Sequence, residues 1–240
     1  MAESRETIVS VSALSKVYGQ DEVSVRALNQ VSFALTKGDF VAVAGPSGSG
    51  KSTLLNLLGG LDSPSEGQVT IAGIELGSLS RAALSAMRLY KIGFVFQSYN
   101  LLPVLTAYEN AEYVLLLQGQ PAAERRARVM ALLERVGLGG LEHRYPRQLS
   151  GGQQQRVAVA RSIVAEPALV LADEPTANLD SKSGESLIDL MVELNQEKRI
   201  TFLFSTHDPH VMSHARRILR LTDGRIAFDG AWHEYQQLPQ

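Results

Sequence analysis

Two glycine-rich stretches of this sequence carry residues that are suited to binding phosphate. The first is GPSGSGKS at Gly45 to Ser52, with the spacing G-x-x-x-x-G-K-[ST], and the second is LSGGQ at Leu149 to Gln153. Glycines let a loop direct several backbone N–H groups at one anion, and a nearby lysine adds a positive charge. One nucleotide does not need two such loops, so the presence of both requires an explanation.

The first stretch has the sequence context of a phosphate-binding loop. It follows an apolar run, FVAVA at Phe40 to Ala44, and precedes the helical pattern STLLNLLGG. We expect Lys51 to reach the β- and γ-phosphates and the Ser52 hydroxyl to ligate Mg²⁺. The loop and the helix N-terminus that hold the phosphates are Gly45, Pro46, Ser47, Gly48, Ser49, Gly50, Lys51, Ser52 and Thr53. The alternative is an ordinary glycine-rich turn between a strand and a helix.

Polar residues that suit hydrolysis end other apolar runs. Asp173 and Glu174 close ALVLADE, and adjacent side chains of a strand point in opposite directions, so the two carboxylates can do different work. Asp173 is a candidate Mg²⁺ ligand, and Glu174 can polarise an attacking water. His207 follows ITFLFS, and Gln97 ends IGFVFQ, where it could contact Mg²⁺ or that water. Taken singly, each of these residues is more often a helix cap, a solvated turn or a structural side chain.

The apolar runs predict an α/β fold that is built on a mostly parallel, twisted sheet. FVAVA, ALVLA and ITFLFS are continuous apolar runs of the kind that form buried parallel strands. Alternation in VSFAL and QVTIAG predicts an antiparallel layer near the N-terminus, and ILRLTDGRIAFDG predicts a hairpin around Asp223-Gly224. We expect residues 1–240 to form one domain, with a mostly helical subdomain inserted at about residues 98–160.

Composition limits the classes of protein that need to be considered. The net charge of −2 gives no sign of a nucleic-acid partner, and the absence of cysteine excludes disulfides and thiolate zinc sites. The N-terminus lacks the pattern of a signal peptide, and no apolar run is long enough to cross a bilayer. We therefore expect a protein that is soluble by itself and cytoplasmic.

The motifs together resemble the nucleotide-binding subunits of ABC transporters. The resemblance rests on the phosphate loop, Gln97, LSGGQ, LVLADEP, NLD at Asn178 to Asp180, and His207, in the same order and spacing. It extends from about Ile8 to Gly230 and implies an ATPase that uses MgATP. The resemblance also implies that Tyr18 stacks on adenine, Gln97 senses Mg²⁺ and faces a membrane partner, His207 holds the γ-phosphate beside Glu174, and Asp180 communicates across a dimer. For Tyr18, simple packing remains an alternative.

The resemblance explains the second glycine-rich stretch. In this family two ATPase subunits face each other head to tail, and the serine and glycines of one close over the ATP that the other holds. Ser150, Gly151, Gly152 and Gln153 would therefore complete the site of a second copy. Ser150 is a good N-cap, so the helix that follows would direct its free N–H groups and its dipole at a γ-phosphate.

Two longer stretches point to the branch that releases lipoproteins and exports macrolides. These stretches are GFVFQSYNLLPVLTAYEN and ADEPTANLD, although that branch typically has glycine where this chain has Ala177. Only a short tail follows the C-terminal hairpin, so we expect the transmembrane permease subunits to be separate chains. The ATPase would form a homodimer and bind them at the cytoplasmic face of the membrane. The alternatives are a soluble ABC ATPase of DNA repair or translation, and an ordinary P-loop kinase or GTPase.

The segment after Gln97 is a candidate docking surface for such a partner. SYNLLPVL, from Ser98 to Leu105, is rich in apolar residues and contains Pro103, which prevents a regular helix. Connecting segments normally lie on the surface, where so much apolar area is unusual. The alternative is that this segment packs into the core of the helical region.

Overall fold

The continuous apolar runs form the middle of a six-stranded sheet with the strand order β10-β9-β3-β8-β7-β6. The computed structural model describes residues 6–19 and 24–238. Five strands run parallel, and β10 is antiparallel to β9, as the hairpin signal predicts. The strands are β3 (Phe40–Ala44), β6 (Ile92–Val95), β7 (Leu169–Asp173), β8 (Thr201–Ser205), β9 (Arg217–Thr222) and β10 (Arg225–Gly230).

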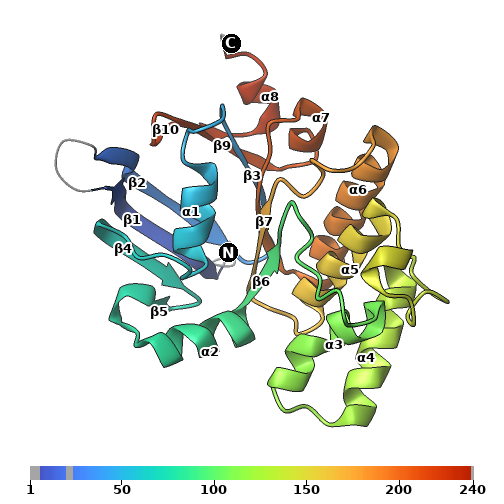
Figure 1. Cartoon of the computed structure of the whole chain (residues 1–240). Helices are drawn as coiled ribbons and strands as arrows, with labels where there is room; N and C mark the ends of the chain where they lie inside the picture. The colour runs from blue at the N-terminus through green and yellow to red at the C-terminus, as the bar shows by residue number, and fades with distance from the viewer. Residues whose placement is uncertain (1–5, 20–23, 239–240) are drawn as a thin grey trace, which may run out of the picture.

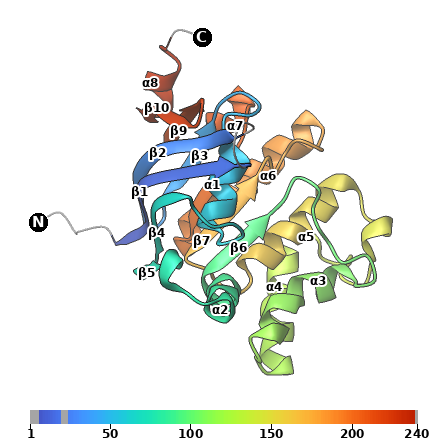
Figure 2. The same cartoon turned by 60° about the vertical axis from the view of Figure 1, so that its left-hand side comes forward.

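A four-stranded antiparallel sheet covers one side of this sheet, with α1 between the two (Figures 1 and 2). Its order is β2-β1-β4-β5, which confirms the predicted antiparallel layer. The elements are β1 (Thr7–Tyr18), β2 (Val25–Thr36), β4 (Glu66–Ile71), β5 (Ile74–Glu75) and α1 (Lys51–Leu58). A short 3₁₀ turn, η2 (Leu76–Ser78), and α2 (Arg81–Lys91) lead back to β6.

Helices cover the other side of the six-stranded sheet, as Figures 1 and 2 show. They are α3 (Ala107–Leu117), α4 (Ala122–Arg135), η3 (Pro146–Gln148), α5 (Gly151–Ile163) and α6 (Ser181–Lys198). Two short helices, α7 (Pro209–Met212) and α8 (Trp232–Tyr235), follow β8 and β10. Gly137 follows the end of α4 with a φ of 73°, where the sequence predicts a helix cap.

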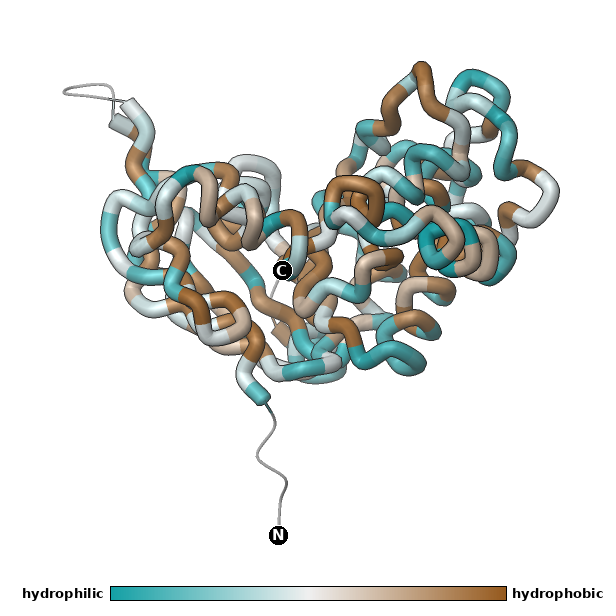
Figure 3. The backbone as a smooth tube through the Cα atoms, turned by 90° about the horizontal axis from the view of Figure 1, so that it is seen from below, coloured by the Kyte–Doolittle hydropathy of each residue, from teal (hydrophilic) through white to brown (hydrophobic). Residues whose placement is uncertain are grey.

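Alternate residues of the buried strands enter two different cores. In β3, Phe40, Ala42 and Ala44 pack against the helices α3 to α6, whereas Val41 and Val43 face α1 and the antiparallel sheet. A strand that is buried on both faces needs apolar residues at every position, which is why its sequence does not alternate. Viewed from below, the chain forms two lobes, and hydrophobic segments run through both (Figure 3).

The helices at residues 98–160 lie where the sequence predicts them, but α5 continues to Ile163. Val157, Ala160 and Ile163 of this helix belong to the same core as the sheet residues Val170 and Phe202. The treatment of this region as a separate subdomain stays a proposal. Helix α5 begins at the second glycine-rich loop and ends in the core beneath the sheet, so it connects this loop to the sheet.

Candidate functional site

The first glycine-rich loop joins β3 to α1 and leaves the first turn of this helix open to a ligand. Gly50 is the N-cap, with a φ of 103°, and neither a side-chain cap nor an acidic residue occupies the helix N-terminus. A Cβ at Gly50 would lie 2.5 Å from the Ala27 carbonyl oxygen, and one at Gly45 would lie 2.3 Å from that of Leu221. Larger residues would therefore displace the loop, which explains the glycines at these two positions.

Lys51 places its ammonium directly over this loop. Its Nζ donates hydrogen bonds to the carbonyls of Gly45, at 2.8 Å, and Pro46, at 3.0 Å. The positive charge and the free N–H groups of α1 therefore point into one space, as anion binding requires. That space is a cavity of about 580 Å³, within the usual size range of ligand sites, and its lining includes Ser47, Gly48, Gly50, Lys51, Ser52 and Thr53.

Asp173 is held at the end of β7 by two hydroxyl groups. Ser205 Oγ donates to Asp173 Oδ1 at 2.6 Å, and Ser52 Oγ lies 3.2 Å from the same oxygen. The predicted metal ligands Ser52 and Asp173 are thus brought together. Ser205 is fully buried, and the sequence reasoning missed it, although a serine that ends the apolar run ITFLFS is a signal of such a role.

Glu174 and His207 form a pair in the same cavity as the phosphate loop. His207 Nδ1 lies 3.0 Å from Glu174 Oε1, and Gln97 also lines the cavity. The histidine side chain is 74% exposed, whereas that of Glu174 is only 17% exposed. Glu174 has a φ of 45°, and its backbone N–H donates to Ser205 Oγ at 2.9 Å. This unusual backbone conformation, fixed by a buried hydroxyl, sets the direction of the carboxylate.

The second glycine-rich loop begins α5 with a capping box, as the sequence predicts for Ser150. Ser150 Oγ accepts a hydrogen bond from the Gln153 N–H at 3.3 Å, and Gln153 Oε1 accepts one from the Ser150 N–H at 2.9 Å. Ser150, Gly151, Gly152 and Gln153 do not line the cavity that contains Lys51. Gly151 instead lies beside Tyr99 and Asn178. Within one chain, the two glycine-rich loops therefore belong to different places.

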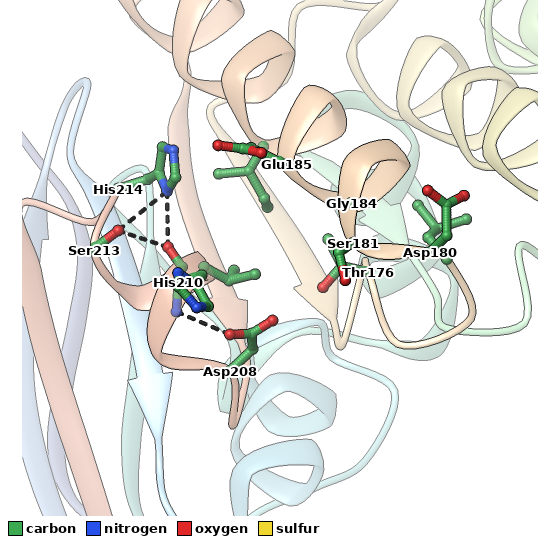
Figure 4. Close-up of a pocket in the computed structure, with 12 residues that line it drawn as sticks. Thr176, Asp180, Ser181, Gly184, Glu185, Asp208, His210, Ser213 and His214 are labelled. Atoms are coloured by element: carbon green, nitrogen blue, oxygen red, sulfur yellow. Dashed lines mark hydrogen bonds between the residues drawn. The ribbon is translucent and has the colours of Figure 1, made fainter.

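Asp180 caps α6 at the edge of a second cavity. Its Oδ1 accepts a hydrogen bond from the Ser183 N–H at 3.0 Å, and hydrogen bonding by Ser183 lowers the pKa of Asp180. The cavity has a volume of about 440 Å³. Figure 4 shows Asp180 and Ser181 on the α6 side and His210 and His214 on the other side. Asp180 is therefore separate from the catalytic pair within this chain.

Tyr18, the predicted adenine-stacking residue, is the last residue of β1. Its side chain lies outside the lining of the phosphate cavity. Burial and the hydrogen bond to Asp62 raise the pKa of Tyr18, and the Thr53 hydroxyl, in the first turn of α1, opposes this shift in part. The residue is 41% exposed. An aromatic ring beside the phosphate loop and open to solvent is available for stacking.

Two contacts that the sequence reasoning missed connect the segment after Gln97 to other motifs. Asn178 Nδ2 donates to the Gln97 carbonyl at 2.9 Å. Arg161 of α5 donates to the carbonyls of Asn100, at 2.6 Å, and Tyr99, at 2.9 Å, and its burial lowers the pKa of its guanidinium. The segment that carries Gln97 is therefore bonded both to the NLD motif and to the helix of LSGGQ.

In the described part of the chain, no group of three or more histidines or acidic residues is arranged to hold a metal ion. This is compatible with Mg²⁺, which is commonly bound by one or two carboxylates together with substrate phosphates. Across the same residues, 6–19 and 24–238, no helix has the length and apolar character needed to span a membrane.

Known proteins of similar sequence agree on one family. Residues 28–177 match the family model described as ABC transporter. An uncharacterized ABC transporter ATP-binding protein of Thermotoga maritima is 50% identical over 211 residues, which cover 88% of this chain and 90% of that protein. The lipoprotein-releasing system ATP-binding protein LolD of Pseudomonas fluorescens is 48% identical over 224 residues, covering 93% and 98%.

A longer relative and a solved structure extend this agreement. The macrolide export ATP-binding/permease protein MacB of Rhodospirillum rubrum is 45% identical over 229 residues, but this chain spans only 35% of its length. A dimeric ATP-binding cassette bound to ADP and Pi superposes with a TM-score of 0.86 at 42% identity, covering 94% of this chain and 99% of the other. The predicted fold and branch are confirmed. Since the family model and relatives of matching length agree, this chain belongs to the ABC transporter family as an ATP-binding, ATP-hydrolysing subunit.

Proposed function

We propose that this chain hydrolyses MgATP as a homodimer bound to separate membrane permease subunits, and that it drives export or extraction of lipoproteins, lipids, drugs or peptides. The observation that carries the proposal is the Glu174–His207 pair in the cavity of the phosphate loop. A carboxylate at this place can orient water toward the terminal phosphate that Lys51 and the N-terminus of α1 attract. Of these cargo classes, lipoproteins are named for LolD, and macrolides, a class of drug, are named for MacB.

The side chains at the carboxyl ends of β3, β7 and β8 divide the catalytic work. Lys51 neutralises charge on the β- and γ-phosphates, and Glu174 polarises the attacking water. His207 holds the γ-phosphate and keeps the Glu174 carboxylate in place through their contact at 3.0 Å. Ser52, Asp173 and Gln97 offer hard oxygen atoms, which fit Mg²⁺. When bound there, Mg²⁺ would neutralise developing charge on the phosphate oxygens.

The LSGGQ loop of one copy would complete the site of the other. Ser150 to Gln153 present a capped helix N-terminus that does not line the cavity of Lys51 in the same chain. This position supports a composite site, in which the loop binds the nucleotide of a second copy. A helix N-terminus carries partial positive charge and suits a γ-phosphate. The neighbouring structure of similar sequence is itself a dimer bound to ADP and Pi. Asp180 would then communicate between the two sites.

A permease would dock beside the segment Ser98 to Leu105. Leu102 is 39% exposed and Val104 is 77% exposed, although Leu101 packs against the core. A groove of about 430 Å³ lies nearby, and its lining includes Leu61, Leu89, Phe94, Phe96, Val114 and Leu117. An apolar groove of this kind can accept a short helix of a membrane subunit, which would place the ATPase at the cytoplasmic face of the membrane.

The rival assignment, a soluble ABC ATPase of DNA repair or translation, has less support. The relatives described above are named as parts of transport systems. A nucleic-acid partner would also favour a basic surface, whereas the net charge is −2.

Two substitutions test the catalytic assignment in purified protein. Glu174→Gln should lower ATP turnover by about 10²- to 10⁴-fold and leave ATP binding intact, because the amide keeps the shape but not the basicity. Lys51→Ala should weaken nucleotide binding itself. Glu166→Gln, which removes a carboxylate that pairs with Lys198 at 2.6 Å, is the matched control and should hydrolyse ATP normally. Near wild-type hydrolysis by Glu174→Gln would exclude Glu174 from this role.

A further inference from the structure

Two charged side chains, Lys16 and Asp62, contact the exposed side chain of Tyr18. Tyr18 Oη donates a hydrogen bond to Asp62 Oδ2 at 2.9 Å. Lys16 Nζ donates to Asp62 Oδ1 at 2.7 Å and also lies 4.8 Å from the centre of the Tyr18 ring. The ammonium therefore sits over one face of the ring, where a cation–π interaction is favourable. The hydroxyl and one face of the ring are both held, and the Tyr18 residue is still 41% exposed.

The carboxylate that holds Tyr18 is itself fixed by its own loop. Asp62 Oδ1 accepts a hydrogen bond from the Ser63 N–H at 2.7 Å, and Lys16 Nζ donates to the Ser63 carbonyl at 2.8 Å. Ser65 bonds the end of β1 twice, through Val17 N–H to Ser65 Oγ at 3.0 Å and through Ser65 N–H to the Ser15 carbonyl at 2.9 Å. The loop after α1 and the end of β1 thus form one bonded unit.

This unit is connected to the phosphate loop through a single helix. The phosphate loop ends at the N-terminus of α1, and Asp62 follows shortly after the C-terminus of the same helix. The Leu61 N–H donates to the Asn56 carbonyl of α1 at 2.9 Å, which ties the loop to the last turns. Rigid placement of a stacking group relative to a phosphate site lowers the conformational entropy that the protein side chain loses when a nucleotide binds.

The protonation states in the cluster suit these bonds at neutral pH. Burial and the hydrogen bond to Asp62 raise the pKa of Tyr18, so the phenol remains a donor. Partial burial raises the pKa of Asp62, but hydrogen bonds from Lys16, Tyr18 and the Ser63 amide outweigh it, and the net effect is a lowered pKa. The carboxylate therefore remains a charged acceptor between two donors.

We propose that Asp62 and Lys16 are positioning residues that hold Tyr18 as a platform with one free face, on which the adenine base of the nucleotide stacks. Lys16 covers one face of the ring, so the base stacks on the other face. Neither Asp62 nor Lys16 touches the reacting phosphates in this arrangement. The inference rests on the proposed function, because it takes Tyr18 as the base-binding residue of an ATP site.

The test compares MgATP with magnesium tripolyphosphate, which has the phosphates but no base. Binding of each is measured by calorimetry for the wild type, Tyr18→Ala, Asp62→Ala, Asp62→Asn and Lys16→Met. Tyr18→Ala should weaken ATP binding by about 5- to 100-fold, since base–aromatic stacking has this strength. Asp62→Ala keeps the ring but releases it, so we expect a loss of about 3- to 10-fold. Tripolyphosphate binding should stay unchanged in all four variants.

The variant Asp62→Asn distinguishes a positioning role of Asp62 from a role in the general stability of the fold. Asp62→Asn keeps an acceptor for the Tyr18 hydroxyl and should recover part of the ATP affinity that Asp62→Ala loses. Lys37→Met is the control for Lys16→Met, because Lys37 pairs with Glu6 at 3.2 Å and precedes β3, at the end opposite to the phosphate loop. The pKa of Tyr18 should fall when Asp62 is removed. It is measured from tyrosinate absorbance, by subtracting the signal of the same variant that also carries Tyr18→Phe.

The outcomes distinguish this inference from the proposed function. If the wild type binds neither ATP nor tripolyphosphate, the phosphate-loop assignment fails. If Tyr18→Ala weakens ATP binding and Asp62→Ala does not, Tyr18 needs no positioning and the inference is wrong. A parallel loss of tripolyphosphate affinity in folded Asp62→Ala would assign Asp62 to support of the phosphate loop instead. Selective loss of ATP affinity, with partial rescue by asparagine, supports the inference.

Discussion

Asn110 is buried in α3 and holds the segment that we propose as the docking surface. Its Oδ1 accepts a hydrogen bond from the Leu102 N–H at 2.8 Å. Its Nδ2 lies 3.1 Å from the carbonyl oxygen of Leu102, 3.0 Å from that of Leu105 and 2.9 Å from that of Thr106. Replacement by leucine, whose side chain has the same number and branching of heavy atoms, removes all of these bonds at one position. It therefore tests whether this asparagine determines the path of the segment.

The expected loss of stability follows from the bonds that have no replacement. The Thr106 carbonyl keeps a bond from the Asn110 N–H, and the Leu102 carbonyl keeps one from the Leu105 N–H. The loss therefore falls mainly on the Leu102 N–H and the Leu105 carbonyl. Leaving a buried polar group without a partner costs about 1 to 3 kcal/mol. Both groups are near the surface and leucine gains apolar contacts, so we expect Asn110→Leu to lower the free energy of unfolding by about 2 kcal/mol.

Urea unfolding followed by circular dichroism measures this change. The midpoint should fall while the m-value stays unchanged, because the surface exposed on unfolding is the same. Leu116→Ala, on the exposed surface of α3, is the control and should change the free energy by less than about 0.5 kcal/mol. ATP binding at the phosphate loop should persist in folded Asn110→Leu. A midpoint equal to that of the wild type would show that Asn110 does not hold the segment.

Three further substitutions test the partner surfaces and one helix cap. Ser150→Arg should block ATP-driven dimerisation and hydrolysis while each subunit still binds ATP. Mixing it with Lys51→Ala should restore some activity, because a mixed dimer has one intact site. Full activity of pure Ser150→Arg in an ATPase assay would contradict the composite site. Leu102→Glu should release the membrane partner in co-purification, because a charge at an apolar contact is unfavourable. The subunit itself should stay folded, since Leu102 is 39% exposed. Retention of the complex with full transport would exclude this docking surface. Glu109→Ala should cost about 1 kcal/mol near pH 7, because Glu109 accepts hydrogen bonds from the Thr106 N–H and hydroxyl, which also lower its pKa. Because the pKa of Glu109 is lowered in the folded state, this stabilisation is present above the ordinary glutamate pKa and is lost as the pH falls through the folded pKa. The difference between the wild-type and variant urea midpoints should therefore disappear in acid. A difference that is independent of pH would contradict the assignment.

Local patterns of sequence determined the elements that hold the site. The apolar run Phe40 to Ala44 and the glycines that follow it predicted β3, the phosphate loop and α1, because a buried parallel strand and a loop with positive φ angles admit few residue types. The same holds for the Ser150 cap, which depends on residues within one helical turn. Asp173, Glu174 and His207 follow apolar runs in the sequence and lie beside the loop in the structure, since the carboxyl ends of parallel strands meet at one edge.

Tertiary structure alone decided which distant groups support these elements. The place of Ser205 at the end of ITFLFS suggests a polar role, but the sequence does not name Asp173 and the Glu174 amide as its partners, and nothing near Asp62 indicates that it holds Tyr18. The reason is physical: a serine or an aspartate can bond to many partners, and the path of the chain determines which of them comes within about 3 Å. Short patterns describe what a segment can do by itself, whereas these partners come from segments that meet only after the sheets and helices have packed.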